Sequence, residues 1–273
     1  MTKPFRSRTI WAIFPFLVVL PSACTWLDPL DDDYQLRPPG TATGGAGDGG
    51  AAAAGGAPSG GGGSGSAGGT GPRTVTFGER PTSTHDGVTY DTQLSRTNDT
   101  LNYGASMTGW ADDSQNSERR VTLFRFDLSA IPQGATVEEV TLRLCTGDDA
   151  QYSDSVGTVR FYRLLQSWDE GDQKGAEGVA NWNLRTTAEP WAEEGAGPGS
   201  HDGGTELGAF IGADVSTEYE VTLLTSAVQD WVDNPDSNFG VVAWTLSDDG
   251  TEMILSEHIA GGRRPELEVT YAP

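Results

Sequence analysis

The sequence predicts an all-β fold: an antiparallel β-sandwich with one short helix, preceded by a linker rich in glycine and alanine. From Arg73 onward, short runs of β-branched and aromatic residues alternate with clusters of Gly, Asp, Asn and Pro, an arrangement typical of antiparallel sandwiches. Within these runs, apolar residues such as Val140, Leu142 and Leu144 are separated by single other residues. Because strand side chains point alternately to opposite faces, this period of two indicates strands buried on one face.

The first 23 residues have the pattern of a secretory signal peptide. A basic start with Lys3, Arg6 and Arg8 is followed by the apolar run Ile10–Leu20. As a helix, this run is too short to span the roughly 30 Å of hydrocarbon in a bilayer. We therefore interpret residues 1–23 as a signal peptide and not as a membrane-spanning anchor.

A cysteine follows this segment directly. The small residues Ser22 and Ala23 precede Cys24, and this pattern resembles the bacterial lipobox, which implies lipidation at Cys24. The residue after Cys24 is Thr25 and not an aspartate. By the same resemblance, this favours the outer membrane of a Gram-negative bacterium. We expect an outer-membrane lipoprotein, at the cell surface or secreted, and an ordinary cleaved signal peptide is the alternative. Acylation of Cys24 would leave Cys145 without a disulfide partner.

Residues 24–72 are interpreted as an acidic segment followed by a disordered tether. Between Gly40 and Gly71, 16 of the 32 residues are glycine and 8 are alanine. Such a composition cannot bury enough apolar surface to offset the entropy of the chain. Residues 73–273 are then expected to form a single β-sandwich domain, carried at the end of this tether.

Charge limits the partners of the protein. The chain has 17 Lys and Arg against 39 Asp and Glu, a net charge of −22. A surface of this sign repels phosphate, which excludes non-specific binding of nucleic acid. It also disfavours long acidic polymers, unless a local basic patch or bound cations intervene.

One segment has helical periodicity. Ser226 and Gln229 have the spacing of a capping box, and the sequence Asn234-Pro235 is expected to end the helix. Four apolar residues fall on one helical face: Leu224, Val228, Trp231 and Val232. We expect a helix of about two turns at one end of the sandwich, with Trp231 facing inward.

Five segments, in order, resemble the DNRLRE domains, also described as disaggregatase-related or family 96 carbohydrate-binding modules. The segments are "YDTQLSRTNDTLNYGAS" (90–106), "RRVTLFRFDLSAIPQGATVEEVTLRL" (119–144), "VRFYRLLQSWDEG" (159–171), "VTLLTSAVQDWVDNPDSNFGVVAW" (221–244) and "ILSEHIAGGRRPELEVTY" (254–271). The resemblance implies a jelly-roll-like sandwich that binds carbohydrate, with acidic polysaccharides such as alginate as the characterised class.

The resemblance does not imply catalysis. The sequence has no HExxH, no GxSxG and no glycine-rich phosphate loop after a strand, so we expect a binding protein and no enzyme. A non-catalytic structural or adhesion protein of the cell surface, without a sugar site, is the alternative. A polysaccharide-degrading enzyme is a third, less favoured hypothesis.

Carbohydrate binding needs flat aromatic faces and a few directed hydrogen bonds. Trp110 in the polar segment "MTGWADDSQN", Tyr103 and Trp191 are the aromatic candidates. Four further tryptophans have reasons of period or helix face to point inward: Trp168, Trp182, Trp231 and Trp244. We interpret Trp168 and Trp182 as plugs on the end of the sandwich.

Arginines are the cations that an anionic sugar would meet. The candidates are Arg119, Arg143, Arg160 and Arg163. Gathered on one sheet face they would form a basic site, and as outward strand residues they would only balance nearby acids. Both alternatives remain open from the sequence.

Loop carboxylates are the ligands that Ca²⁺ prefers, so a structural Ca²⁺ is considered. The candidate ligands are Asp112 and Asp113, then Asp148, Asp149 and Asp154, and the acids of "WDEGD", which are Asp169, Glu170 and Asp172. Solvated charge that only maintains solubility is the alternative.

Overall fold

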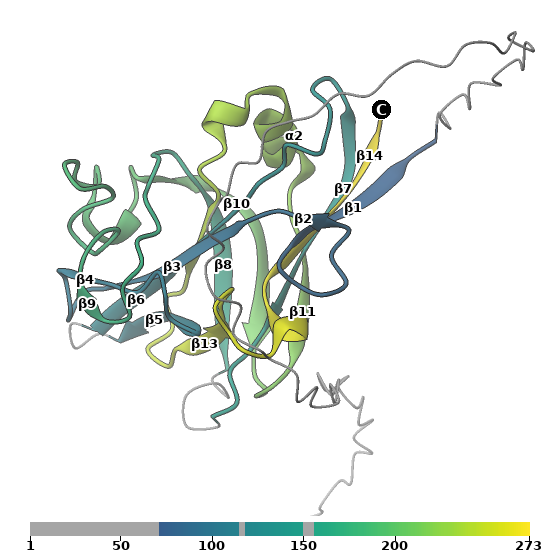
Figure 1. Cartoon of the computed structure of the whole chain (residues 1–273). Coiled ribbons are helices and arrows are strands. Elements are labelled where there is room, and N and C mark those ends of the chain that lie inside the picture. Colours follow the sequence, from purple (N-terminus) through teal and green to yellow (C-terminus); the bar gives the residue numbers. More distant parts are fainter. Residues whose placement is uncertain (1–70, 115–117, 150–155) are drawn as a thin grey trace, which may run out of the picture.

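The structure of the protein, a computed structural model, describes residues 71–114, 118–149 and 156–273. Within these ranges two β-sheets pack face to face, and one α-helix covers part of their shared edge (Figure 1). The predicted β-sandwich with a short helix is therefore confirmed. Cys24 and Asp154 lie outside the described residues, as do the signal segment and most of the linker. No helix within the described ranges is long and apolar enough to cross a membrane.

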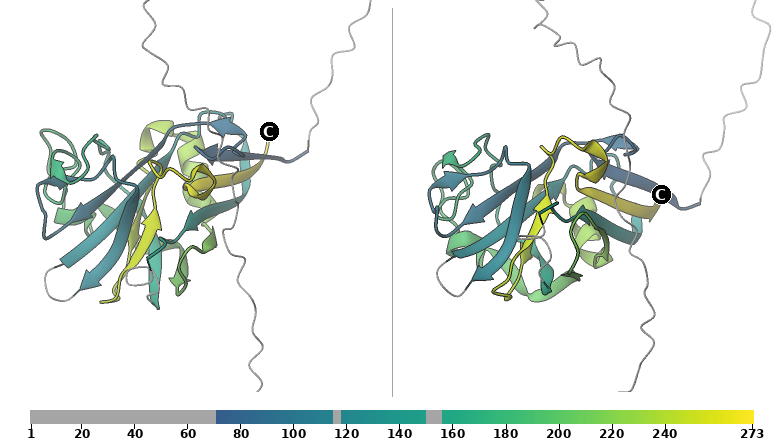
Figure 2. Two further views of the ribbon diagram at one scale, coloured as in Figure 1. Left: turned by 60° about the horizontal axis from the view of Figure 1, so that its bottom comes forward. Right: turned by 90° about the horizontal axis from the view of Figure 1, so that it is seen from below.

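The first sheet has five strands, and it joins the start of the domain to its end. Its order is β11 (Glu218–Thr222), β7 (Thr136–Cys145), β14 (Glu266–Ala272), β1 (Arg73–Gly78) and β2 (His85–Asp86). Strands β1 and β14 run antiparallel with Arg73 opposite Tyr271, and Figure 2 shows them side by side next to the C-terminus. Both ends of the domain are thereby fixed in one sheet.

The second sheet has seven strands. Its order is β10 (His201–Gly212), β8 (Gly157–Leu164), β12 (Val241–Trp244), β6 (Glu118–Phe126), β5 (Thr108–Ser114) and β13 (Thr251–Ile254), with β3 (Thr89–Ser95) also paired to β6. A small separate pair joins β4 (Leu101–Asn102) to β9 (Ala176–Glu177). The described pairings are antiparallel except that of β1 with β2, so the sheets are built as the alternating sequence pattern predicted.

The main core lies between the two sheets. Val140, Leu142 and Leu144 of β7 point into it, and Phe124 and Phe161 meet them from the opposite sheet. Each of these five side chains is at most 1% exposed. Burying one such side chain contributes about 1.5–3 kcal/mol. Within the described residues this burial acts without a disulfide, and the buried Cys145 lies near Glu218.

A second core lies on the outer face of the seven-stranded sheet. Here Leu123 and Val242 meet Trp168, Trp182 and Trp191, which come from residues 166–200, the segment between β8 and β10. We call residues 166–200 the cover segment, and it lies to the left in Figure 1. Trp168 and Trp182 were expected to plug the end of the sandwich. They cover a face instead, because alternate positions of β6 and β12 are apolar on that side too.

The tryptophans of the cover segment are satisfied inside the protein. The indole N–H of Trp168 donates to the carbonyl of Phe239 at 2.8 Å, and that of Trp191 donates to the carbonyl of Asn181 at 2.9 Å. Trp168, Trp182 and Trp191 are 2%, 6% and 4% exposed. The inward orientation predicted for Trp168 and Trp182 is confirmed.

The α-helix of the described residues, α2 (Thr225–Asp233), packs against β7. Trp231 and Val232 face inward as predicted, but Leu224 is 44% exposed and only flanks the helix. The predicted capping box is wrong: the N-cap residue is Leu224, without a side-chain hydrogen bond. The side-chain amide of Gln229 instead binds the backbone at the start of β7. It accepts a hydrogen bond from the Val137 N–H and donates one to the Ala135 carbonyl.

Candidate functional site

The arginines proposed for an anionic ligand are all engaged with acids. Arg119 holds Asp113 through two hydrogen bonds of 2.8 and 2.7 Å, and Arg163 pairs with Asp230. Arg160 pairs with Glu206 on the neighbouring strand. Arg143 lies on the other sheet, among Glu220, Glu266 and Glu268. The structure spreads these arginines over both sheets, and the pairs fit the alternative in which they balance nearby acids.

The aromatic candidates do not share a surface either. Trp110 lies half-buried on β5, and the guanidinium of Arg120 is 5.3 Å from its ring centre. Tyr103, in the loop after β4, is half-buried, and its hydroxyl accepts a hydrogen bond from Asn98. Trp191 is buried in the second core. Its ring is thus occupied by packing and presents no face at the surface.

The loop aspartates predicted as Ca²⁺ ligands are partly committed to other partners. Asp113 is bound by Arg119, and Asp148 accepts hydrogen bonds from Ser216 and Arg263. Asp112 accepts one from the backbone N–H of Ser114, while Asp149 is exposed. Of the acids in "WDEGD", Glu170 has a different environment, because it lies in a group of carboxylates.

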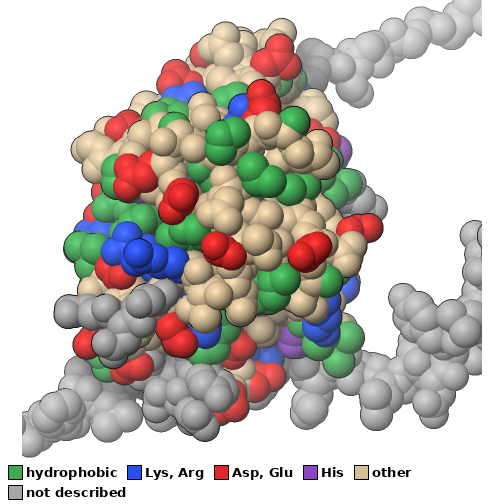
Figure 3. Space-filling view, turned by 90° about the vertical axis from the view of Figure 1, so that its left-hand side faces the viewer, with side chains coloured by type: hydrophobic (Ala, Val, Ile, Leu, Met, Phe, Trp, Pro, Cys, Tyr) green, Lys and Arg blue, Asp and Glu red, His purple; other side chains and the backbone are tan. Residues whose placement is uncertain are grey.

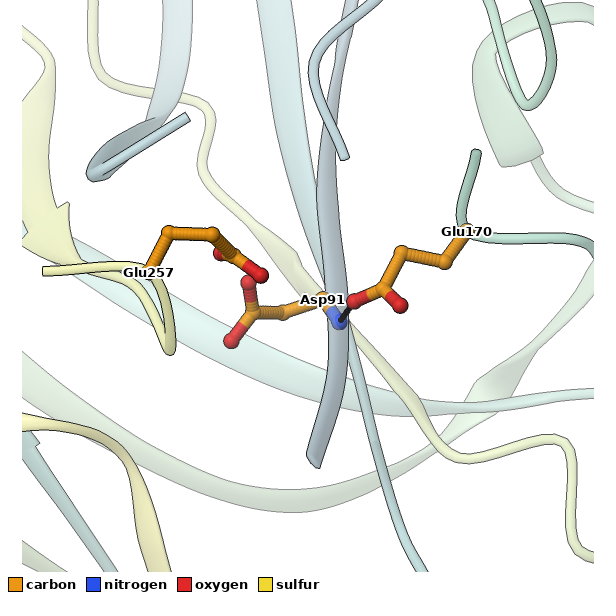
Figure 4. Close-up of side chains that lie close together, drawn as sticks. All are labelled: Asp91, Glu170 and Glu257. Carbon is orange, nitrogen blue, oxygen red and sulfur yellow. Dashed lines mark hydrogen bonds between the residues drawn. The ribbon is translucent and has the colours of Figure 1, made fainter. Parts of the chain in front are cut away.

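Three carboxylates from distant parts of the chain meet beside β3 (Figure 4). They are Asp91 of β3, Glu170 of the cover segment and Glu257 in the loop after β13. One oxygen atom of each lies within 4.8 Å of the others. Asp91 is fully buried, and the two glutamates are half-buried. We call these three residues the carboxylate cluster.

Short hydrogen bonds fix the positions of the cluster. The backbone N–H of Asp91 donates to Glu170 Oε1 at 2.6 Å, as the dashed line in Figure 4 shows. The backbone N–H of Ser256 donates to Asp91 Oδ2 at 2.9 Å. Asp91 Oδ1, Glu257 Oε2 and the Ser256 hydroxyl are buried atoms that make no hydrogen bond within the described residues.

The "NYG" motif positions Glu170. The buried Asn102 amide donates to the carbonyls of Glu170 and Ala180 at 2.7 and 2.9 Å. Gly104 lies so close to the Glu170 carbonyl that a Cβ at this position would overlap it. Glycine is therefore required at Gly104 for the approach of the two loops, and this approach brings the Glu170 carboxylate to Asp91.

Burial makes the charged forms of the cluster costly. Desolvation, followed by the charge of Glu257, raises the pKa of Asp91 well above its usual value. Burial also raises the pKa of Glu257, and it raises the pKa of Glu170 to about 7. Arg125 is the cation that opposes this effect at Glu170. Three close carboxylates with this little compensation therefore favour the uptake of protons or of a cation.

A groove lies beside the cluster, on the other side of Tyr90. Its volume is about 460 Å³, and residues that line it include Tyr90, Arg125, Ser129, Gln133, Trp231 and Asn238. The indole N–H of Trp231 is buried and makes no hydrogen bond with the described residues. The groove thus combines aromatic rings with polar side chains, the composition typical of small-molecule and sugar sites.

Arg125 is the unusual cation of this groove. Its guanidinium lies 4.2 Å from the centre of the Tyr90 ring and 5.3 Å from that of Trp168. It is half-buried and makes no ion pair with a described acid. In the same part of the chain, Arg73 and Arg96 also lack an ion pair, but both are exposed. Burial lowers the pKa of Arg125 from its usual value, yet a guanidinium remains charged at neutral pH.

Sequence reasoning missed Tyr90, Arg125 and two of the three cluster acids. A signal existed, because Asp91, Glu170 and the Ser256-Glu257 pair all occur in the segments that carried the family resemblance. The register that places Tyr90 opposite Arg125 was not available from the sequence. Figure 3 shows the side of the molecule at the left of Figure 1, where acidic side chains stand apart and the largest group of Lys and Arg lies toward the left of the view.

Comparison with known proteins finds a similarity over part of the domain. Residues 82–173 match the family model of carbohydrate-binding module family 96. The matched range contains Tyr90, Asp91, Arg125 and Glu170, while Glu257 lies beyond it. No curated protein matches the chain. The match shows that residues 82–173 are similar to a carbohydrate-binding module of family 96.

Proposed function

We propose that the domain binds a polysaccharide that carries carboxylates, and that it does so in the groove beside Arg125. The observation that carries this proposal is the half-buried guanidinium of Arg125, which makes no ion pair with the described acids and borders an open groove. An arginine that is partly desolvated and has no carboxylate of its own is suited to accept one from a ligand, through two parallel hydrogen bonds.

The other groove residues complete a plausible recognition surface for a sugar chain. The Tyr90 ring offers a flat face, held in place by its contact with Arg125. Ser129 and Gln133 supply exposed polar groups. Asp127 also lines the groove, and its charge disfavours a densely anionic polymer in every register. Binding is thus expected to depend on one carboxylate placed at Arg125.

Catalysis is not part of this proposal. The close carboxylates of the cluster resemble a hydrolase pair only in composition, because Asp91 is fully buried and a glycosidic oxygen cannot reach it. A test is to incubate the purified protein with the polysaccharide that it binds and to measure new reducing ends. Turnover that survives Asp91→Asn and Glu257→Gln would require another site and would restore the enzyme hypothesis.

The proposed setting is the bacterial envelope. Lipidation at Cys24 would anchor the chain in the outer membrane, and residues 24–72 would act as a tether that displays the domain. The support is the basic, apolar and small-residue pattern before Cys24. Palmitate labelling of the full-length protein in cells tests this anchor. Label that is equal in the wild type and in Cys24→Ser would remove it.

Binding is tested with the purified protein, a polyuronate such as alginate and a neutral glucan of similar length. Calorimetric titration should show binding to the polyuronate that weakens with added salt. Arg125→Gln should reduce the affinity about tenfold or more, consistent with the loss of a charged hydrogen-bonded pair. Arg96→Gln is the matched control, because Arg96 is exposed, makes no ion pair with a described acid and lies outside the groove.

Two outcomes would contradict the proposal in different ways. If Arg125→Gln binds as tightly as the wild type, the groove is the wrong site although the domain binds sugar. If the protein binds neither the polyuronate nor the glucan nor any member of a broad polysaccharide panel, the structural or adhesion protein without a sugar site becomes the better hypothesis.

A further inference from the structure

We infer that the carboxylate cluster of Asp91, Glu170 and Glu257 is a binding site for one divalent cation, and that this cation is Ca²⁺. The site differs from the ones that the sequence suggested at Asp112, Asp113 and Asp148. It is also separate from the groove, so the inference does not depend on the identity of a polysaccharide.

The arrangement of oxygens fits a single ion. One oxygen of each carboxylate lies within 4.8 Å of the others. Ca²⁺ binds oxygen at 2.3–2.6 Å, so two ligands on opposite sides of one ion are about 4.6–5.2 Å apart. The three oxygens are therefore close enough to share an ion without a change of backbone (Figure 4).

Buried atoms without partners give a second and independent indication. Ser256 is 2% exposed, and its hydroxyl lies near the carboxylates of Asp91 and Glu257, yet this oxygen makes no hydrogen bond of good geometry. Asp91 Oδ1 is likewise unpaired in a side chain that is fully buried. An unpaired buried carboxylate oxygen is costly, and coordination to a cation would satisfy both atoms.

The chemistry of the donors selects the type of ion. The cluster offers carboxylate and hydroxyl oxygens and neither nitrogen nor sulfur, which favours the hard cations Ca²⁺ and Mg²⁺ over Zn²⁺. Three carboxylates with two oxygens each, together with a hydroxyl, can approach the six to eight ligands that Ca²⁺ takes. Mg²⁺ keeps several waters and is less suited to a fully buried aspartate.

A bound ion would join three segments that are far apart in the sequence. Asp91 belongs to the sheet, Glu170 to the cover segment, and Glu257 to the loop between β13 and β14. Glu79 lies near enough to add to the negative field at both glutamates, and it is partly neutralised by Arg264. The ion would replace this repulsion by attraction and would fix the cover segment against β3.

The inference is tested with protein freed of metal by a chelator that is then removed. Calorimetry should show one Ca²⁺ per chain, and Ca²⁺ should raise the midpoint of thermal unfolding. Asp91→Asn and Glu257→Gln should each weaken Ca²⁺ binding at least about tenfold. Trp168 lies two residues before Glu170, so bound Tb³⁺ should show luminescence excited through tryptophan, and excess Ca²⁺ should remove it.

Controls separate loss of binding from loss of folding. Asp112→Asn changes an acid at the site that the sequence suggested, and Glu138→Gln removes a charge from an exposed position on β7. Both should bind Ca²⁺ as the wild type does. Without metal, Asp91→Asn and Glu257→Gln should unfold at or above the temperature of the wild type, because each removes a carboxyl group whose charged form is costly in this buried position.

The inference is overturned if the wild type binds none of Ca²⁺, Mg²⁺ and Mn²⁺ in calorimetry and in the Tb³⁺ assay. It is also overturned if Asp91→Asn and Glu257→Gln, both folded, bind Ca²⁺ like the wild type. Loss of binding in Asp112→Asn alone would place the ion at the other aspartates. Tighter binding of Mg²⁺ than of Ca²⁺ would overturn the choice of ion.

Discussion

Tyr90 and Arg125 lie opposite each other on β3 and β6, with the guanidinium carbon of Arg125 4.2 Å from the centre of the Tyr90 ring. Two environments meet at this pair of residues. Asp91, the next residue on β3, belongs to the carboxylate cluster, and Tyr90 and Arg125 line the groove. The negative charge of Glu170 raises the pKa of Arg125, although burial lowers it more. The register of one strand pair thus places a cation for ligand binding next to a site for a metal.

The first prediction concerns the Tyr90 ring. Tyr90→Leu removes the flat face and the cation–π contact, so polyuronate affinity should fall about tenfold. Tyr90→Phe keeps the ring and should stay within about twofold of the wild type. Calorimetric titration measures both. Tyr103→Leu changes the aromatic residue that the sequence suggested, and it should not alter affinity; a larger loss in Tyr103→Leu than in Tyr90→Leu would contradict the assignment of the groove.

The second prediction concerns the Asn102 amide, which makes four hydrogen bonds in a buried position. It donates to two carbonyls and accepts from the N–H groups of Gly104 and Gln173 at 3.2 and 3.0 Å. Asn102→Ala leaves these groups without partners and should lower the free energy of unfolding by about 2–5 kcal/mol.

Urea denaturation monitored by circular dichroism measures the effect at Asn102. Asn98→Ala is the control, because Asn98 is exposed and donates only to the Tyr103 hydroxyl through its amide. It should change stability by less than about 1 kcal/mol. Equal effects of the two substitutions would mean that the Asn102 network does not hold the loops together.

The third prediction concerns pH and His201. Burial lowers the pKa of this imidazole, although the Ala196 carbonyl and the acids Glu193 and Asp202 oppose the shift. Its Nδ1 is 2.6 Å from the Ala196 carbonyl, and the ring packs on Tyr162. A histidine with a lowered folded pKa binds fewer protons than the unfolded chain, so its contribution to stability is complete above about pH 6.5 and is lost as the pH falls.

His201→Asn isolates this effect, because the asparagine amide can donate to the same carbonyl and does not titrate. Urea midpoints at about pH 7.5 and about pH 5 should show that the wild type loses more stability than the variant on acidification. The acids of the cluster titrate in both proteins and cancel in the comparison. Parallel pH profiles of the two proteins would contradict the prediction.

The fold could be predicted from the sequence because its signals are local. The alternation in β7 and the helical face of Trp231 and Val232 are read within a few residues, and both are confirmed. The prediction of a capping box was wrong because of a tertiary contact: the Gln229 amide forms its hydrogen bonds with the backbone at the start of β7. The predicted location of Trp168 and Trp182 was wrong for a similar reason, because the local sequence does not show which face of a sheet is covered by another segment.

The site could be predicted only in part, since its residues meet by long-range register. Asp91 is 79 positions from Glu170 and 165 from Ser256. Because each segment contributes a single acid to the cluster, no short motif in the sequence indicates that these acids form one site. Glu170 was suggested as a Ca²⁺ ligand, but together with neighbours in its own loop. Arg125 differs from Arg160 only by its partners, and pairing across strands decides which arginine is left without an acid.

The fourth prediction concerns the contact of Gly195 with Trp182 in the cover segment. Gly195 has a φ of 66°, and a Cβ at this position would overlap the indole of Trp182. Gly195→Ala therefore adds a clash to the cost of a left-handed conformation, and it should lower the free energy of unfolding by more than about 2 kcal/mol. The clash should also displace Trp182, which a change in tryptophan fluorescence would report.

Gly134→Ala separates the two causes. Gly134 has a φ of 85°, but no atom lies within 4 Å of the position of its Cβ. In this variant only the left-handed backbone conformation is unfavourable. The free energy of unfolding should therefore fall by about 1 kcal/mol, and the fluorescence should stay that of the wild type. If both variants lose the same stability, the cover segment yields to the added methyl group, and the packing of Trp182 is looser than the contact with Gly195 implies.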